Sequence, residues 1–269
     1  MSRQRIDALL AERGLAPSRT SAAESVRAGR VRIGRDGPLA QKPSQLVSDD
    51  AELLLSDDQR FVSRGGIKLE NALEALAIDV AGLDCLDVGA STGGFTDCLL
   101  ARGAARVIAL DVAHGQLDWG LRNDPRVTVI ERSNARELTA DELPYRPGLA
   151  TVDVSFISLA KVVPAIAGCL APGGALLAMV KPQFELGKGR ARAGVVRDPA
   201  DRREALLAAA TAIEDAGLGI RAFASSGLPG PKGNRETFVW CGGEGAPDAD
   251  PEAALLAAEA APVTEGEPA

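Results

Sequence analysis

Residues 87–96 read Asp-Val-Gly-Ala-Ser-Thr-Gly-Gly-Phe-Thr, a glycine-rich turn between an apolar run at Cys85–Val88 and a helical pattern near 94–102. Glycines let a backbone approach a bound ligand closely and adopt conformations that other residues avoid. A strand, such a turn and a helix in this order are typical of an open α/β sheet, which binds ligands beyond the carboxyl ends of its strands. The stretch therefore predicts both a fold and the place of a site.

Helical patterns and apolar strands alternate from Arg64 onward, which indicates a mostly parallel sheet with crossover helices. We expect helices near 66–77, 94–102, 158–168 and 200–216. The expected strands are Cys85–Val88, Val107–Leu110, Val127–Ile130, Leu149–Val152, Ala175–Val180, Ile220–Ala224 and Glu236–Trp240. Seven strands complete a doubly wound sheet, so the predicted fold class is α/β with a Rossmann-like sheet.

The N-terminal residues follow a different pattern. A helical apolar pattern runs from Ile6 to Arg13, and Ser18 is a suitable N-cap for a second helix that ends at Gly29. Val31–Ile33 and Leu53–Leu55 indicate a small β-structure. We therefore expect a small α+β domain at 1–58, a linker at 59–63 and the larger α/β domain at 64–243.

The formal net charge of −7 comes from the end of the chain. Residues 244–269 hold seven acidic residues and no Lys or Arg, so the preceding 243 residues carry 30 charges of each sign. We expect this tail to be flexible, either a solvated extension or a short frayed helix. Residues 1–42, in contrast, hold nine basic residues against four acidic ones. A local basic surface of this kind suits contacts with phosphate.

Several classes of protein are disfavoured by the composition. The chain has no run of 18 apolar residues, and its first residues are polar, so we expect a cytoplasmic protein without a membrane partner. Cys85, Cys98, Cys169 and Cys241 lie far apart and form no C-x-x-C pair. Neither a metal site nor a disulfide framework is indicated.

The glycine-rich turn also indicates the cofactor. The second strand stops at Asp111, about 20 residues later, where a carboxylate could accept the ribose hydroxyls of an adenosine cofactor. The turn reads G-x-x-x-G-G rather than the G-x-G-x-x-G of dinucleotide sites, and it lacks the Gly-Lys-Ser/Thr of a P-loop. It resembles the first motif of FtsJ-like methyltransferases, which implies S-adenosylmethionine. The expected cofactor-binding residues are Asp87, Gly89, Ala90, Ser91, Gly93, Gly94, Phe95, Asp111 and Asn134. His114 is expected to border this pocket.

Charged residues at other strand ends indicate the chemistry. Asp153 ends the fourth strand and Lys181 ends the fifth, while Lys68 and Glu236 could fold back to the same edge. This order resembles the Lys-Asp-Lys-Glu tetrad of ribose 2′-O-methyltransferases. Lys181 could take the proton of a ribose hydroxyl or stabilise the alkoxide, and the two carboxylates would orient the lysines. An isolated Asp at a strand end is often only a helix cap, and a lysine is often only a solvated charge.

Other methyl acceptors fit the sequence less well. Methyltransferases that act on base amino groups usually carry D/N-P-P-Y/F after the fourth strand, whereas this chain has Asp153-Val-Ser-Phe156. Methylation at base C5 uses a cysteine nucleophile, usually after proline, and none of the four cysteines follows one. The ribose oxygen is the favoured acceptor.

Residues 4–56, with Arg5-Ile6-Asp7, Ser18-Arg19, Gly29-Arg30 and Lys42-Pro43-Ser44, resemble an S4-type RNA-binding domain. Expected RNA contacts are Arg3, Arg5, Arg19, Arg30 and Lys42, joined by Lys188 and Arg190 of a glycine-rich loop that could equally be merely solvated.

Together with Ser63-Arg64-Gly65-Gly66, Ser155-Phe156-Ile157-Ser158-Leu159 and Lys181-Pro182-Gln183-Phe184-Glu185, these motifs resemble the TlyA family over about residues 4–241. The resemblance implies 2′-O-methylation of cytidine in 16S and 23S ribosomal RNA, with ribosomal RNA, expected within ribosomal subunits, as the partner. The family has also been called haemolysin. A membrane-active protein and a non-catalytic RNA-binding adaptor are therefore the alternatives.

Overall fold

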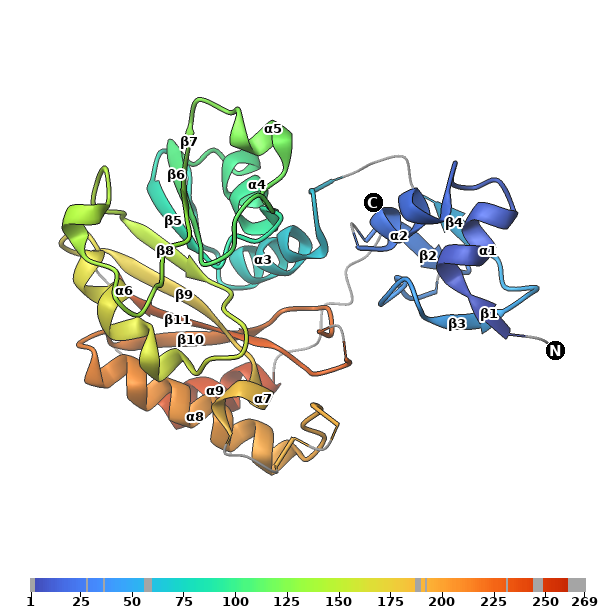
Figure 1. Ribbon diagram of the computed structural model, residues 1–269. Coiled ribbons are helices and arrows are strands. Elements are labelled where there is room, and N and C mark those ends of the chain that lie inside the picture. Colours follow the sequence, from blue (N-terminus) through green and yellow to red (C-terminus); the bar gives the residue numbers. More distant parts are fainter. Residues whose placement is uncertain are drawn as a thin grey trace.

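The computed structural model describes residues 3–27, 29–35, 37–55, 60–186, 190–191, 193–230, 232–243 and 249–260. They form a small N-terminal domain and a larger domain built on a seven-stranded sheet (Figure 1).

The N-terminal domain packs two helices against two short antiparallel strand pairs. Its elements are β1 (Arg3–Arg5), α1 (Ile6–Glu12), α2 (Arg19–Arg27), β2 (Val31–Ile33), β3 (Leu46–Ser48) and β4 (Leu53–Leu55). Strand β1 pairs with β3, and β2 pairs with β4. Ile6, Leu10, Val26 and Val31 are fully buried between them. The sequence predicted both helices, β2 and β4, but not β1 or β3. All four strands have only three residues, and β1, which reads Arg-Gln-Arg, has no apolar residue that would mark a strand.

The larger domain alternates strands and helices. Its strands are β5 (Asp84–Val88), β6 (Arg106–Asp111), β7 (Val127–Glu131), β8 (Leu149–Val152), β9 (Ala175–Val180), β10 (Ile220–Ser225) and β11 (Thr237–Gly242). Its helices are α3 (Arg64–Ala75), α4 (Gly94–Ala101), α5 (Trp119–Arg122), η1 (Ala140–Glu142), η2 (Leu159–Lys161), α6 (Val163–Cys169), α7 (Pro182–Glu185), α8 (Pro199–Asp215) and α9 (Pro251–Ala260). All seven predicted strands are confirmed to within two residues.

The sheet has the strand order β10-β11-β9-β8-β5-β6-β7, in which only β11 runs antiparallel to its neighbours. The chain moves outward from β5 to β7 and then returns to place β8 on the other side of β5. The turns after β5 and β8 therefore diverge at this point, where open α/β sheets leave a crevice for a ligand.

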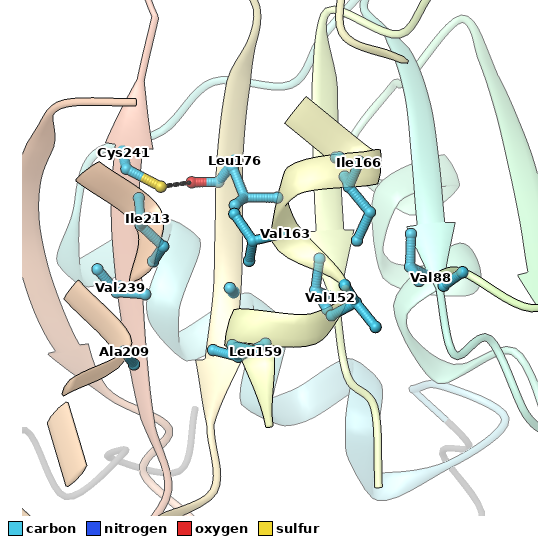
Figure 2. Packing of buried hydrophobic residues seen from close by; sticks show 14 of the residues in the cluster. Val88, Val152, Leu159, Val163, Ile166, Leu176, Ala209, Ile213, Val239 and Cys241 are labelled. Carbon is cyan, nitrogen blue, oxygen red and sulfur yellow. Dashed lines mark hydrogen bonds between the residues drawn. The ribbon is translucent and has the colours of Figure 1, made fainter. Parts of the chain in front are cut away.

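Apolar side chains cover both faces of the sheet. On one face, Val88, Val152, Leu176 and Val239 of the strands pack against helical residues such as Ile213 (Figure 2). On the other face, Leu69 and Leu73 of α3 and Leu99 of α4 pack against Leu177 and Phe238. The core thus holds the strand ends, and with them the site, in fixed positions.

The tail expected to be flexible is partly helical. Residues 251–260 form α9, which packs against β10 and α8, and Leu255 is only 2% exposed. Because one buried leucine supplies this anchor, the acidic composition of the tail concealed it. Residues 244–248 and 261–269 lie outside the described residues.

Candidate active site

The glycine-rich loop spans the point where β5 and β8 diverge. Gly89 has φ +85°, and a Cβ atom there would lie 2.5 Å from the carbonyl oxygen of Asp153. Gly93 has φ +98° as the N-cap of α4, and a Cβ atom there would meet the Leu121 side chain at 2.3 Å. Both positions therefore require glycine, since a side chain would be strained and would also clash. The loop lies against the strand that carries Asp153.

Asp87 lies beneath this loop rather than in a pocket. It is fully buried, and its carboxyl accepts hydrogen bonds from the hydroxyls of Thr96 at 2.7 Å and Thr151 at 3.4 Å. Burial raises the pKa of Asp87 to about 7; the Thr96 hydrogen bond opposes the shift, and the charge of Asp153 adds to it. These hydrogen bonds join the end of β5 to α4 and β8, so Asp87 holds the two ends of the loop in place.

Asp111 holds the other side of the loop. Its two carboxylate oxygens accept the backbone N–H groups of Ser91 and Ala113, each at 2.7 Å. Ser91 has φ +49°, so this bond fixes a conformation that a non-glycine residue rarely adopts. Asp111 also lines a small pocket together with Ala90, Ser91, Ala109, Ala113, Gln116, Leu117, Val129 and Glu131. Each oxygen of Asp111 keeps a second lone pair for a ligand.

The four tetrad residues form two ion pairs. Lys68 of α3 pairs with Glu236, which precedes β11, and Lys181 pairs with Asp153. Lys181 also donates to the Ser155 hydroxyl at 3.0 Å. Lys68 and Lys181 are 8% and 9% exposed, and Glu236 is 3% exposed. Buried lysines are rare unless they are paired, so a role as simple solvated charges does not fit these two.

The sheet register places the two pairs at one edge. Thr237 lies opposite Val180 in the antiparallel pair β11·β9, so Glu236 and Lys181 each extend one residue beyond it at the same end. Val152 lies beside Val88 and Ala178, which places Asp153 between the glycine-rich loop and Lys181. Gly230 makes room for Glu236, because a Cβ atom there would lie 2.5 Å from its Oε1.

A cleft of about 400 Å³ opens beside this edge. Lys68 and Asp153 line it, along with Gly89, Ala90, Ser91, Thr92, Gly94 and Phe95 of the glycine-rich loop. Ala90 and Ser91 line both this cleft and the Asp111 pocket. The two hollows are therefore neighbours across the loop, and an elongated ligand could occupy both.

The predicted RNA contacts are arranged in different ways. Arg5 and Arg19 both pair with buried Asp7, and these charges lower the pKa of its carboxyl. Arg3 donates to the Leu46 carbonyl and Arg30 to the Ser25 hydroxyl. Lys42 lines the cleft.

Three other predicted residues, Arg190, Asn134 and His114, are not among those that line the two hollows. Arg190 pairs with Asp201 and Glu204, which leaves less of its charge for RNA, and Lys188 lies outside the described residues. The Asn134 side chain bonds within its own turn, to Glu137 and the Arg136 amide. His114 is exposed, 3.6 Å from Glu131.

Sequence reasoning missed some residues of the site. Glu131 ends β7 as Asp111 ends β6, so the same strand-end rule would have selected it. Phe156 is 91% exposed beside the tetrad, has φ +65°, and lies with its ring 5.2 Å from that of Phe184. No sequence signal distinguishes such an exposed aromatic residue from a buried one.

Comparisons with known proteins agree with this architecture. The family described as FtsJ-like methyltransferase matches residues 61–243, and the S4 domain matches residues 4–53. The chain is 53% identical over 241 residues to the 16S/23S rRNA (cytidine-2'-O)-methyltransferase TlyA of Mycobacterium tuberculosis, covering 88% of this chain and 89% of that protein.

The haemolysin name occurs among similar proteins as well. Hemolysin A of Brachyspira hyodysenteriae is 38% identical over 86% of this chain and 97% of its own length. A solved structure of a candidate hemolysin from Streptococcus thermophilus has a TM-score of 0.73 at 36% identity, covering 96% of both chains. Among the described residues, no helix combines the length and apolarity needed to cross a membrane.

Proposed function

The chain belongs to the TlyA family of FtsJ-like methyltransferases, and from this premise we propose that it methylates the 2′-oxygen of cytidine ribose in 16S and 23S ribosomal RNA. The observation that carries the proposal is the pairing of Lys68 with Glu236 and of Lys181 with Asp153 at one edge of the sheet. Two buried lysines, each held by a carboxylate, are the groups that a ribose hydroxyl needs in order to react.

The loop and the Asp111 pocket fit S-adenosylmethionine. Gly89 and Ala90 of the loop line the cleft, and the absence of a side chain at Gly89 leaves its backbone exposed to a ligand there. Asp111 offers free lone pairs toward the ribose of the cofactor, and Leu117 and Val129 supply apolar surface in the same pocket. When bound, the cofactor supplies a sulfonium methyl group that is already activated for transfer.

Lys181 is the residue proposed to take the proton of the ribose hydroxyl. An ammonium group cannot accept a proton, so in this role Lys181 acts as the neutral amine at the moment of transfer. Asp153 and Ser155 orient its Nζ atom. Lys68, which is held in place by Glu236, would stabilise negative charge on the ribose oxygen.

The experiment combines mapping of the product with substitution of Lys181. The wild-type protein and Lys181→Ala are incubated with ribosomal subunits and labelled cofactor, and 2′-O-methyl groups are located by resistance to alkaline cleavage. We expect cytidine ribose to be labelled, with kcat lowered by about 10²–10⁴ in the variant and cofactor affinity unchanged.

Lys181→Arg is the matched control for charge. Arginine keeps the charge but does not give up its proton at accessible pH, so we expect it to be as inactive as the Ala variant. High activity of the Arg variant would make Lys181 an electrostatic stabiliser instead of a base. Label on a base, or none on RNA, would overturn the proposed function.

A further inference from the structure

The N-terminal domain forms one wall of the catalytic cleft. Arg27 at the end of α2 and Gln41, Lys42 and Pro43 of the loop before β3 line the cleft that Lys68 and Asp153 line from the larger domain. The RNA-binding domain is therefore part of the site where the reaction takes place. It is more than a remote docking module.

Two cations on this wall differ from the other charged groups of the cleft. Lys68 and Asp153 are each paired within the tetrad, and Arg64 donates to the carbonyl oxygens of Gln41 and Pro229. The side chains of Arg27 and Lys42, in contrast, have no hydrogen bond or ion pair with any residue that the structure describes. Their charges remain available to an anion that enters the cleft.

The wall is fixed in place by contacts between the domains. The Arg64 guanidinium donates to the Gln41 carbonyl at 2.7 Å, to the Gln41 side-chain oxygen at 3.1 Å and to the Pro229 carbonyl at 2.9 Å. Gly29, two residues beyond Arg27, lies so close to α3 that a Cβ atom would meet Ile67 at 2.9 Å. Both cations therefore sit next to residues that are held against the catalytic domain.

We propose that Arg27 and Lys42 bind the phosphates that flank the target ribose, so that the N-terminal domain holds the reacting nucleotide across the cleft from the tetrad. This inference rests on the proposed function. Every ribose in an RNA strand lies between two phosphates, so a ribose placed at the tetrad brings anions toward the opposite wall. Phosphate contacts of this kind set the position of a strand without reading its sequence.

A strand of RNA fits the two cations better than the cofactor carboxylate does. Arg27 and Lys42 come from separate elements and both line the cleft, an arrangement suited to successive charges along a polyanion. Exposed cations add little to the binding free energy of a single small anion. Contacts to several phosphates of one strand add together and release counterions, so they strengthen binding more. The cofactor carboxylate is therefore the competing ligand in the test.

The first experiment measures binding by Arg27→Ala and Lys42→Ala in the full chain. We expect each variant to bind an rRNA fragment that contains the mapped target about tenfold more weakly, with the salt slope lowered by about one unit. S-adenosylmethionine affinity should be unchanged. Arg35→Ala is the matched control, because Arg35 is an exposed arginine of the same domain that does not line the cleft.

The second experiment tests where the phosphate lies. The phosphates on either side of the target ribose are replaced singly by uncharged methylphosphonates, and kcat/KM is measured for the wild type, Arg27→Ala and Arg35→Ala. We expect one of the replacements to lower kcat/KM about tenfold for the wild type and for Arg35→Ala. The same replacement should lower kcat/KM less than threefold for Arg27→Ala, because this variant has already lost the phosphate contact.

The outcomes separate this inference from the proposed function. Suppose that the wild type methylates cytidine ribose, but every methylphosphonate lowers kcat/KM of Arg27→Ala by the same factor as that of the wild type. This result overturns the phosphate contact and leaves the proposed function intact. If Arg27→Ala binds the cofactor more weakly but binds RNA with unchanged affinity, Arg27 contacts the cofactor carboxylate, and the proposed phosphate contact is overturned. Absence of ribose methylation by the wild type overturns the proposed function itself.

Discussion

At the scale of single residues, Asp111 both holds the glycine-rich loop and lines the pocket proposed for the cofactor, whereas the sequence indicated only the second role. Its oxygens hold Ser91 and Ala113 through backbone hydrogen bonds while they line the pocket proposed for adenosine. A substitution there removes a ligand contact and also releases a strained turn. Cofactor affinity alone therefore does not measure the ligand contact.

We expect Asp111→Ala to weaken S-adenosylmethionine binding by roughly 1.5–3 kcal/mol, the cost of losing hydrogen bonds to a charged acceptor. Isothermal titration calorimetry gives the affinity, and circular dichroism confirms that the variant is folded. Glu131→Gln is the companion variant, because Glu131 lines the same pocket from the next strand. A folded Asp111→Ala protein with wild-type affinity would remove Asp111 from the cofactor site.

Asp87 predicts an unusual dependence of stability on pH. Burial raises its pKa from 3.8 to about 7, so between these values the folded protein keeps a proton that the unfolded chain releases. The free energy of unfolding then falls as pH rises through this window. Asp87→Asn keeps the polar contacts without titrating. Relative to this variant, the wild type should lose roughly 2–4 kcal/mol between pH 4 and pH 7, since one pKa unit corresponds to about 1.4 kcal/mol.

Urea unfolding of both proteins at several pH values measures this difference. Parallel pH profiles for the wild type and Asp87→Asn would show that Asp87 titrates in the folded state as it does in the unfolded chain. Thr96→Val offers a second check, because loss of its hydrogen bond to Asp87 should raise the pKa of that carboxyl further.

At the scale of elements, Asn234 joins the segment before α8 to the strand that carries Glu236. Its side-chain oxygen accepts the Val196 amide at 2.9 Å, and its amide donates to the Gly194 carbonyl at 2.8 Å. Asn234 is only 2% exposed and lies two residues before Glu236. The position of residues 194–196 is therefore coupled to the tetrad through one side chain.

We expect Asn234→Ala to raise KM for RNA by about three- to tenfold and to leave cofactor affinity unchanged, because two buried hydrogen bonds worth about 1 kcal/mol each are lost. Asn234→Asp keeps the acceptor but not the donor and should give an intermediate KM. Hydrogen exchange of the Val196 amide should quicken in the Ala variant. Unchanged exchange together with unchanged KM would contradict the coupling.

At the scale of the whole molecule, Arg64 connects the two domains. It is buried, and its three hydrogen bonds reach the N-terminal domain at Gln41 and the β10–β11 connection at Pro229. Burial lowers the pKa of its guanidinium, an effect that the charge of Glu236 opposes. The same residue therefore links the N-terminal wall of the cleft to the domain that carries the tetrad.

Arg64→Ala should lower kcat/KM for RNA by about 10–100-fold. Loss of its hydrogen bonds would let the N-terminal wall of the cleft move, and a misplaced substrate reacts slowly even when the catalytic groups are intact. Arg60→Ala is the control: Arg60 pairs with Glu70 within the larger domain and makes no bond between domains. We expect less than a twofold effect from it. Methyl transfer assays under single-turnover conditions compare the two, and equal effects would show that interdomain geometry is not limiting.

Much of the architecture could be predicted because it depends on local periodicity. The run Ala175–Val180 is apolar at every position and is bounded by Gly174 and Lys181, so it indicates a strand buried on both faces. The strands β1 and β3 escaped prediction, and the tail that holds α9 was left open between a solvated extension and a short helix, because their partners, and not their own patterns, stabilise them. The role expected of Asn134 stays a prediction, since its side chain bonds within its own turn.

The amino-acid sequence was enough to predict the α/β fold, the glycine-rich turn at the end of the first sheet strand and the residue types of the tetrad, because these depend on local patterns and on polar residues at strand ends. The folded structure was needed to show how those residues pair, that Asp87 is buried beneath the loop, and that Arg27 lines the cleft. Contacts such as Lys68 to Glu236, 168 positions apart, and Arg64 to Pro229, 165 positions apart, depend on how distant elements pack, and packing leaves no periodic trace in the chain.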